Sequence, residues 1–348
     1  MSRHATGLLR AAIGIGISVL CIVLALRGVD LARTASLLGA ARLQWIVLAG
    51  TFIVADLFFR AVRWQTLIAP IHPVPLRRLS GYMLVGYLAN NFLPARLGEL
   101  VRSHYLGDRE GISRSATLGT VVVERVVDTV VLVGIGAIAI LVLNVRGVVG
   151  SAVLVGVALA GLLVVALAVT LAAHRLPGAQ RVAAAATHRW PRVSGIVSRL
   201  RDGLRVAALP STVALSAVLS VAAWGCTVLA FLSVGQALGI ELTVGEGTLL
   251  AAGTNLATAI PSGPGYLGTF EYAGQMIAVA FAIPSESGLA LALLMHALTL
   301  AISTVGGSIA LARLGWTSKS ANRTDGPAAG VGRDVLIAEG YGGPHHER

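Results

Sequence analysis

The sequence predicts an all-α polytopic membrane protein, with about six full transmembrane helices and two oppositely oriented re-entrant or broken helical hairpins. The first observation is composition: of 348 residues, 55% are hydrophobic and only 12% are charged, about half the charged fraction of a typical soluble chain. The second is a series of apolar runs of about 20 residues, each long enough to cross the hydrocarbon core as a helix. The third is a pair of apolar stretches that amides, prolines and glycines interrupt.

The uninterrupted apolar runs are predicted to be full spans. The first run follows Arg3 and Arg10 and lacks a small-residue cleavage site, so we expect a retained span rather than a signal peptide. We expect residues 1–313 to form a single transmembrane domain. Residues 314–348 are rich in Gly, Ala, Pro and charge without a hydrophobic period, and they predict a disordered cytoplasmic tail. The expected spans cover residues 8–26, 43–62, 116–143, 148–173, 211–237 and 288–311.

Charge bias predicts the orientation in the cell (cytoplasmic) membrane. The loop at residues 174–210 carries many arginines against one acid, Asp202, and short arginine-rich loops stay in the cytoplasm. Both termini are basic and therefore also predicted to be cytoplasmic, whereas residues 238–287 carry glutamates without a basic residue, which suits the outside. The stretch 27–42, with three arginines, falls outside on this count and fits poorly. The net charge of +11 indicates topology and contact with anionic lipid rather than nucleic-acid binding.

The number of expected spans on either side predicts that both interrupted stretches are re-entrant. The count of spans places residues 63–78 and 96–114 on the same, cytoplasmic side, so the stretch 79–95, "LSGYMLVGYLANNFLPA", enters and leaves on that side. The same count puts both ends of the stretch 248–283, broken by "PSGPG", outside. The alternative for the first stretch is a short full span, which would move the arginine-rich loop outside.

The two interrupted stretches also resemble each other. The first reads Asn91, then a proline, then "LGE" ending at Glu99; the second reads Asn255, then a proline, then "LGTFE" ending at Glu271. One faces in and the other out, which an inverted-topology repeat would produce. Such repeats, with broken helices that meet near the membrane midplane, are typical of transporters.

Charged residues lie deep within the expected spans. The run "VVVERVVDTVVL" places Glu124 and Asp128 on one helix face, with Arg125 able to pair along it, and "VADLFFRAVRW" places Asp56 and Arg60 four residues apart. Ionised groups at such depth are costly unless paired or hydrated, and they usually mark a functional site. The alternative is that these pairs only lock helices together.

The second hairpin offers different chemistry in "IPSGPGYLGTFE". Gly263, Gly265 and Gly268 leave backbone amides accessible, and Pro264 suits the start of a helix, so an anion site at a helix amino terminus is one hypothesis. The other is that the glycines only permit a tight turn. His296, a lone imidazole on the last span, is expected to be a packed, hydrogen-bonded histidine.

Three motifs together carry a family resemblance. "NNFLPARLGELVRSHYL", "GISRSATLGTVVVERVVDTVVL" and "PSGPGYLGTFE" resemble the flippase-like transmembrane family of lysylphosphatidylglycerol synthases, over about residues 8–313. Members fused to a soluble aminoacyl-transferase domain make and flip aminoacylated phosphatidylglycerol. The longest non-membrane stretches here are too short for such a domain, so the resemblance implies the membrane domain alone, without the synthase half.

The resemblance implies a substrate-binding set and a function. The function is translocation of a polar or anionic lipid, either a phospholipid or a polyprenyl-phosphate lipid, through a charged intramembrane cavity. Two alternatives are a non-catalytic partner of a lipid synthase or glycosyltransferase, and an intramembrane lipid-phosphate enzyme with Glu124 and Asp128 as acid and base. We expect no enzyme activity, no cofactor and no metal. The implied substrate-binding residues are Asn91, Arg96, Glu99, Arg102, Glu124, Arg125, Asp128, Gly263, Gly265, Gly268 and Glu271.

Overall fold

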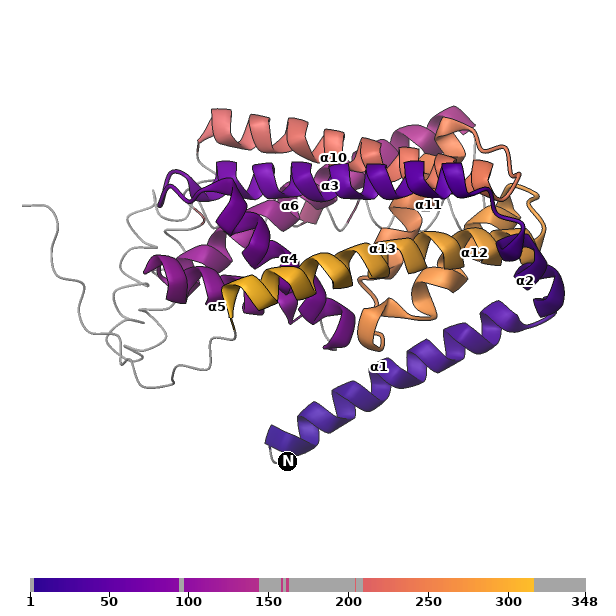
Figure 1. Cartoon of the computed structure of the whole chain (residues 1–348), viewed down its shortest axis with the longest axis horizontal. Coiled ribbons are helices and arrows are strands. Elements are labelled where there is room, and N and C mark those ends of the chain that lie inside the picture. Colours follow the sequence, from indigo (N-terminus) through magenta and orange to yellow (C-terminus); the bar gives the residue numbers. More distant parts are fainter. Residues whose placement is uncertain are drawn as a thin grey trace, which may run out of the picture. The chain divides into compact units, whose positions relative to one another are not determined.

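The structure is a computed structural model that describes residues 3–93, 97–143 and 209–315, with the isolated positions 158, 161, 162 and 204. Every regular element in this part of the chain is a helix, as expected. Figure 1 shows their arrangement. The helices are α1 (Arg3–Leu26), α2 (Leu31–Gly39), α3 (Leu43–Ile68), α4 (Leu76–Phe92), α5 (Gly98–Glu110), α6 (Arg114–Leu143), α10 (Pro210–Ala237), α11 (Val244–Ala257), the 3₁₀ helix η2 (Pro264–Tyr266), α12 (Thr269–Ala280) and α13 (Ser285–Leu314).

Four described helices, α3, α6, α10 and α13, are long and apolar enough to cross a membrane. They contain four of the six expected spans. The expected first span corresponds to α1, which forms a candidate fifth only together with α2, across a bend of 88°. The bend follows from local sequence: Gly28 adopts φ +73°, and the Asp30 carboxylate caps α2 by accepting from the amides of Ala32 (2.9 Å) and Arg33 (3.1 Å). The expected span 148–173 and the tail lie outside the described residues.

The distribution of apolar side chains is that of a protein in lipid. Leu141 and Val142 on α6 and Val218 on α10 are exposed, whereas Arg63 on α3 is completely buried. Lipid solvates an outward apolar face, so the groups that need protein partners are the polar ones. This arrangement turns the charged residues of the helices toward one another.

Helices α3 and α10 form an antiparallel pair, visible along the top of Figure 1. At one end the Arg42 amide donates to the Ala237 carbonyl at 3.0 Å. Further along, the Arg63 guanidinium donates to the Ser220 hydroxyl at 2.7 Å. The pair provides a continuous wall against which α6 and α13 pack.

Helices α4 and α5 fold back on each other as a hairpin. Tyr82 on α4 donates to the Glu110 carboxylate at the far end of α5 at 2.7 Å, so the chain returns toward its starting side. Near the tip the helices touch through glycines: a Cβ on Gly98 would lie 2.0 Å from the Gly86 carbonyl oxygen. The Asn90 side chain accepts from the Gly98 amide at 2.8 Å and so binds the otherwise free amino terminus of α5.

Helices α11 and α12, joined through η2, form a second hairpin. A capping box between Thr243 and Glu246 starts α11, and Gly268, at φ +88°, precedes α12. Gly274 of α12 packs against Thr254 of α11, close to the tip. The second interrupted stretch is therefore a helical hairpin, whereas the stretch 79–95 supplies only the first arm, α4, and the return arm is α5, in residues that were expected to lie in the cytoplasm.

The two hairpins lie against opposite ends of α13. Gly288, at the start of α13, packs against Ala278 of the second hairpin, whereas the last carbonyl of α13, on Leu314, accepts from Arg109 of the first. The hairpin tips meet near the middle of α13, where Gly265 of η2 packs against the Asn91 carbonyl of α4. Figure 1 shows α4 and α5 toward one end of α13 and α12 toward the other.

Candidate functional site

Asp128 of α6 is the centre of a charge network between α3, α5 and α6. Its carboxylate accepts from Arg63 at 2.5 Å, from Arg60 at 3.2 Å and from the Trp224 indole at 2.9 Å. The Arg60 guanidinium also lies over the Trp224 ring, 4.6 Å from its centroid. Two helices, α3 and α10, thus supply three donors to one carboxylate of α6, which satisfies a charge that lipid cannot solvate.

Glu124, one turn earlier on α6, forms the deeply buried part of the network. Its two oxygens accept separately from Arg63 (2.8 Å) and Arg102 (2.9 Å). The Arg102 guanidinium lies over the Trp64 ring, 4.7 Å from its centroid. The side chains of Arg63 and Glu124 are 0% and 1% exposed, so these residues act as a buried link between α3, α5 and α6.

Arg125 and Glu99 form the accessible part of the network. The Arg125 Nε lies 2.7 Å from Glu99 Oε1, and the two side chains are 34% and 26% exposed. This nitrogen has no hydrogen-bond partner, and Nη1 lies 3.9 Å from Asp128 Oδ2, so ion pairs hold the guanidinium. On α3, Arg60 also binds Asp56, four residues earlier, at 2.8 Å. The network pairs the arginines Arg60, Arg63, Arg102 and Arg125 with the carboxylates Asp56, Glu99, Glu124 and Asp128, so its formal charges cancel.

A cavity of about 420 Å³ opens beside this network, between the hairpin tips. Its lining combines charged side chains, termed the charged wall, with uncharged polar side chains and apolar side chains. The charged wall consists of Asp56, Arg60, Glu99, Arg125 and Asp128; the polar lining includes Tyr87, Asn90, Asn91, Trp224, Asn255 and His296; the apolar lining includes Ile53, Leu57, Leu132, Phe231, Leu256, Met295 and Leu300.

The structure therefore brings together only part of the predicted substrate-binding set. Asn91, Glu99, Arg125 and Asp128 line the cavity. The Asn91 amide also donates to hydroxyls on α13, at 2.9 Å each. Arg102 and Glu124 lie behind the charged wall and are not among the lining residues, nor are the glycines of the second hairpin; Arg96 lies outside the described residues.

The glycines of the second hairpin allow the chain to turn at its tip. The Gly263 amide donates to the Ser18 hydroxyl of α1 at 2.8 Å, and the Gly268 amide donates to the Glu271 carboxylate at 2.6 Å. Gly265 adopts φ +65°, which favours glycine. Two of the amides expected to bind an anion are thus engaged by side chains, and this geometry favours the turn hypothesis over the anion site.

Glu271 is paired with a residue from the last span. Its Oε1 lies 2.5 Å from the His296 Nδ1, and the imidazole stacks on Phe270 with centroids 4.4 Å apart. His296 is buried and hydrogen-bonded, as expected from the sequence, and it also lines the cavity. Glu271 is not among the lining residues, and it contacts His296, which is.

Sequence reasoning missed Arg63. It lies three residues after Arg60 and seven after Asp56, so all three share the face of α3 that packs on α6. Periodicity would have found it, because a third charged residue at helical spacing in an apolar run indicates a buried stripe rather than a single pair.

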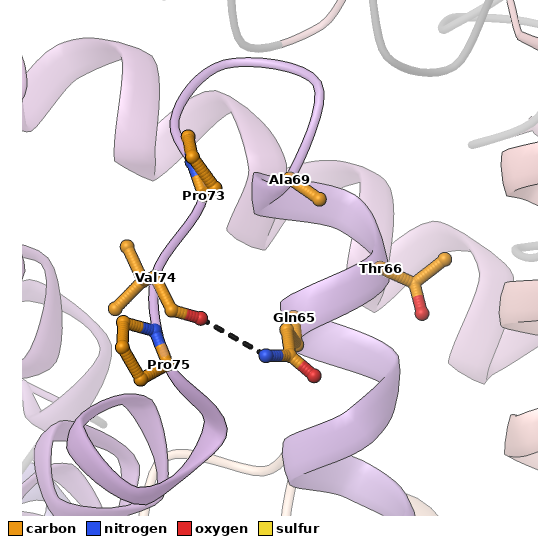
Figure 2. Close-up of a pocket in the computed structure, with 6 residues that line it drawn as sticks. All are labelled: Gln65, Thr66, Ala69, Pro73, Val74 and Pro75. Carbon is orange, nitrogen blue, oxygen red and sulfur yellow. Dashed lines mark hydrogen bonds between the residues drawn. The ribbon is translucent and has the colours of Figure 1, made fainter.

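A second hollow, of about 480 Å³, lies at the connection between α3 and α4 (Figure 2). The Gln65 side chain donates to the Val74 carbonyl at 2.9 Å and fixes the connecting loop. Its lining residues carry no charge, so the ionic chemistry belongs to the first cavity. Among the described residues, no group of three or more His, Cys, Asp or Glu side chains could hold a metal ion.

These features define a class: a multi-pass, all-helical membrane protein that holds an ion-pair network and a polar cavity between its helices. A family model for the transmembrane region of lysylphosphatidylglycerol synthase matches residues 11–307, and the chain belongs to this family. It is also similar to a protein from Haloferax volcanii named glycosyltransferase AglD, at 26% identity over 328 residues. That match covers 84% of this chain and 53% of the relative, so the chain spans about half the length of that protein.

Proposed function

We propose that this protein moves the polar head of a lipid across the membrane through the cavity between the hairpin tips. The observation that carries the proposal is the cavity lining, which combines charged with apolar side chains. A lipid presents the same combination, with an ionic head on apolar chains. A volume of about 420 Å³ is within the range of small-molecule sites, about 300–1,000 Å³.

Arg125 is proposed to bind the lipid phosphate. It lines the cavity, and its side chain is the most exposed among the arginines of the network. A planar guanidinium binds phosphate through two parallel hydrogen bonds. The substrate is therefore an anionic or zwitterionic lipid with a phosphate, either a phospholipid or a polyprenyl-phosphate lipid.

The hairpins are proposed to be an inverted-topology repeat. Their approach to α13 from opposite ends, with tips meeting at its middle, supports two half-spanning elements that enter from opposite faces. Each hairpin would then open or close the shared cavity toward one side of the membrane.

Charge supports an orientation with the first hairpin opening to the cytoplasm of the cell membrane and both termini on that side. The described residues at its base are mainly basic, and those at the other base are mainly acidic. The first set is Arg77, Arg78, Arg109, Arg114 and Arg313 with Asp108 and Glu110; the second is Asp30, Glu241, Glu246 and Glu286 with Arg27, Arg33 and Arg42.

The chain is proposed to act without covalent chemistry. The carboxylates Glu124 and Asp128, the acid and base of the enzyme alternative, each accept from two arginines. Carboxylates held in this way are stabilised as anions and are poor proton carriers. Their geometry favours binding over acid–base catalysis.

Purified protein in proteoliposomes tests the proposal. Fluorescent phosphatidylglycerol, phosphatidylethanolamine and polyprenyl phosphate are supplied in turn, and dithionite quenching beyond the outer-leaflet pool measures transbilayer movement. We expect movement of at least one phosphate lipid, lost in Arg125→Ala and kept in Arg77→Ala, an exposed arginine outside the cavity. Wild-type vesicles that move none of these lipids contradict the proposal.

A second candidate is a non-catalytic partner of a glycosyltransferase or lipid synthase. The observation that favours it is the relative named as a glycosyltransferase, of which this chain matches only about half. Membranes with and without this chain would be compared for transfer of a sugar or amino acid to lipid. Transfer that requires the chain, together with purified protein that moves no lipid, would support the partner function.

A further inference from the structure

We propose that Glu271 and His296 form a proton-binding site on the cavity wall that couples lipid movement to a pH gradient. This inference rests on the proposed function and adds its driving force. The pair is formed by α12 of the second hairpin and by α13, with Oε1 and Nδ1 at 2.5 Å. Both side chains are buried in protein, and His296 faces the cavity.

His296 supplies an imidazole to the described cavity wall, the side-chain type that ordinarily changes its charge near neutral pH. Imidazole does so between about pH 5 and 8, whereas guanidinium groups stay protonated, and each carboxylate of the wall is paired with an arginine. Phenols also keep their proton in this range. The other titratable or charged groups facing the cavity are Asp56 and Arg60 from α3, Tyr87 from α4, Glu99 from α5, Arg125 and Asp128 from α6, and Tyr266 from η2.

Local structure holds Glu271 as the anionic member of the pair. Its second oxygen accepts from the Gly268 amide at 2.6 Å, at the amino terminus of α12, where the helix dipole favours negative charge. Oε1 then orients the imidazole through Nδ1, and stacking on Phe270 fixes the ring plane. Nε2 is the ring nitrogen that remains for proton exchange with the cavity.

Protonation changes the electrostatics that a lipid phosphate meets. With neutral His296 the pair carries one negative charge, which repels an anionic head; with the imidazolium the pair is neutral. The formal charges of the ion-pair network already cancel, so one proton removes the excess negative charge beside the cavity. A proton and a phosphate therefore favour each other's binding, and this coupling is reciprocal. One proton would accompany each anionic head across the membrane.

The test uses full-length protein in phosphatidylcholine vesicles that contain a trace of fluorescent phosphatidylglycerol. Valinomycin with equal potassium on both sides removes the membrane potential, and a pH difference of one unit is imposed. One proton per lipid can drive at most about a tenfold asymmetry between leaflets. We expect the wild-type distribution to become several-fold asymmetric and His296→Gln to lose the asymmetry. His104→Gln, at a half-buried site on α5 that does not line the cavity, should keep it.

A second readout is independent of lipid movement. Protein with ¹⁵N-labelled histidine in nanodiscs is titrated, and His296→Gln identifies the signal. We expect this signal to show gain and loss of the ring proton as the pH is changed, and to respond differently in Glu271→Gln, which keeps the ring and removes the charge.

The outcomes separate the two proposals. A His296 signal that does not titrate, a wild-type distribution that ignores the gradient, or a His296→Gln protein that still follows it, each overturns the proton site. Absence of any lipid movement in wild type overturns the proposed function, and the titration then decides the proton site by itself.

Discussion

Arg63 is the residue whose removal most directly tests the buried ion-pair network. Its side chain is 0% exposed, and it donates to Glu124 (2.8 Å), Asp128 (2.5 Å) and Ser220 (2.7 Å). In Arg63→Met the packing volume is largely kept, but one negative charge loses its balance. Asp128 retains Arg60, and Glu124 retains one donor on α5.

Removing one partner of a buried ion pair costs about 3–5 kcal/mol, because the other charge is left uncompensated. We therefore expect Arg63→Met to lower the free energy of unfolding by about that amount. The effect should shrink when Glu124→Gln is added, because the double variant is neutral again and the amide still accepts from Arg102. A favourable coupling of about 0.5–3 kcal/mol is expected between the two sites.

The assay is unfolding of the purified protein in mixed micelles by increasing SDS, followed by tryptophan fluorescence. Arg77→Met on the exposed start of α4 is the matched control, with an expected change within about 0.5 kcal/mol. Additive losses in the double variant, or an Arg63→Met protein as stable as the control, would refute the argument that charge balance holds these helices together.

Three further predictions follow from other parts of the structure. Arg125→Lys should fold normally yet move lipid much more slowly, since it keeps the charge and loses the planar fork; equal transport rates would remove Arg125 from the site. Single cysteines replacing Arg77 and Glu241, with the native cysteines absent, should react with impermeant maleimide from opposite faces, whereas labelling from one face would contradict the inverted repeat. Gly98→Ala should destabilise the first hairpin by about 1–3 kcal/mol, because its Cβ would lie 2.0 Å from the Gly86 carbonyl oxygen; an unchanged melting temperature would show that the helices can separate without loss.

The helical fold class and the interruption at each hairpin tip could be predicted from the sequence, because their signals are local, whereas the return arm of the first hairpin, α5, could not, because it is polar. Apolar runs of sufficient length indicate helices, and "NNFLP" and "PSGPG" interrupt them visibly. The short helix α2 was missed, since nine residues after a turn give little periodicity. Its bend at Gly28 depends on a positive φ and on a cap by Asp30, which the sequence indicates only as a turn.

The sequence predicted that the site contains buried charged residues. It could not predict which of them face the cavity and which only hold the helices together. Glu124 and Arg125 are adjacent in the sequence, yet one lies behind the wall and the other faces the cavity. Asn90 and Asn91 likewise differ, because the first caps α5 and the second bonds to α13. Rotation by one residue around a helix, about 100°, separates such neighbours, and only the packed arrangement of helices shows which direction is the cavity.

The choice of arginine throughout the network follows from its geometry. Lys319 is the single lysine of the chain and lies far from the network in the sequence. Arg60 and Arg63 each bind two carboxylates on different turns or helices, which a rigid fork with several donors does with little loss of entropy. A buried lysine also loses its proton readily, whereas a guanidinium does not. The arginines of the network therefore keep their charge at any physiological pH, and the proposed response to pH belongs to the separate pair of Glu271 and His296.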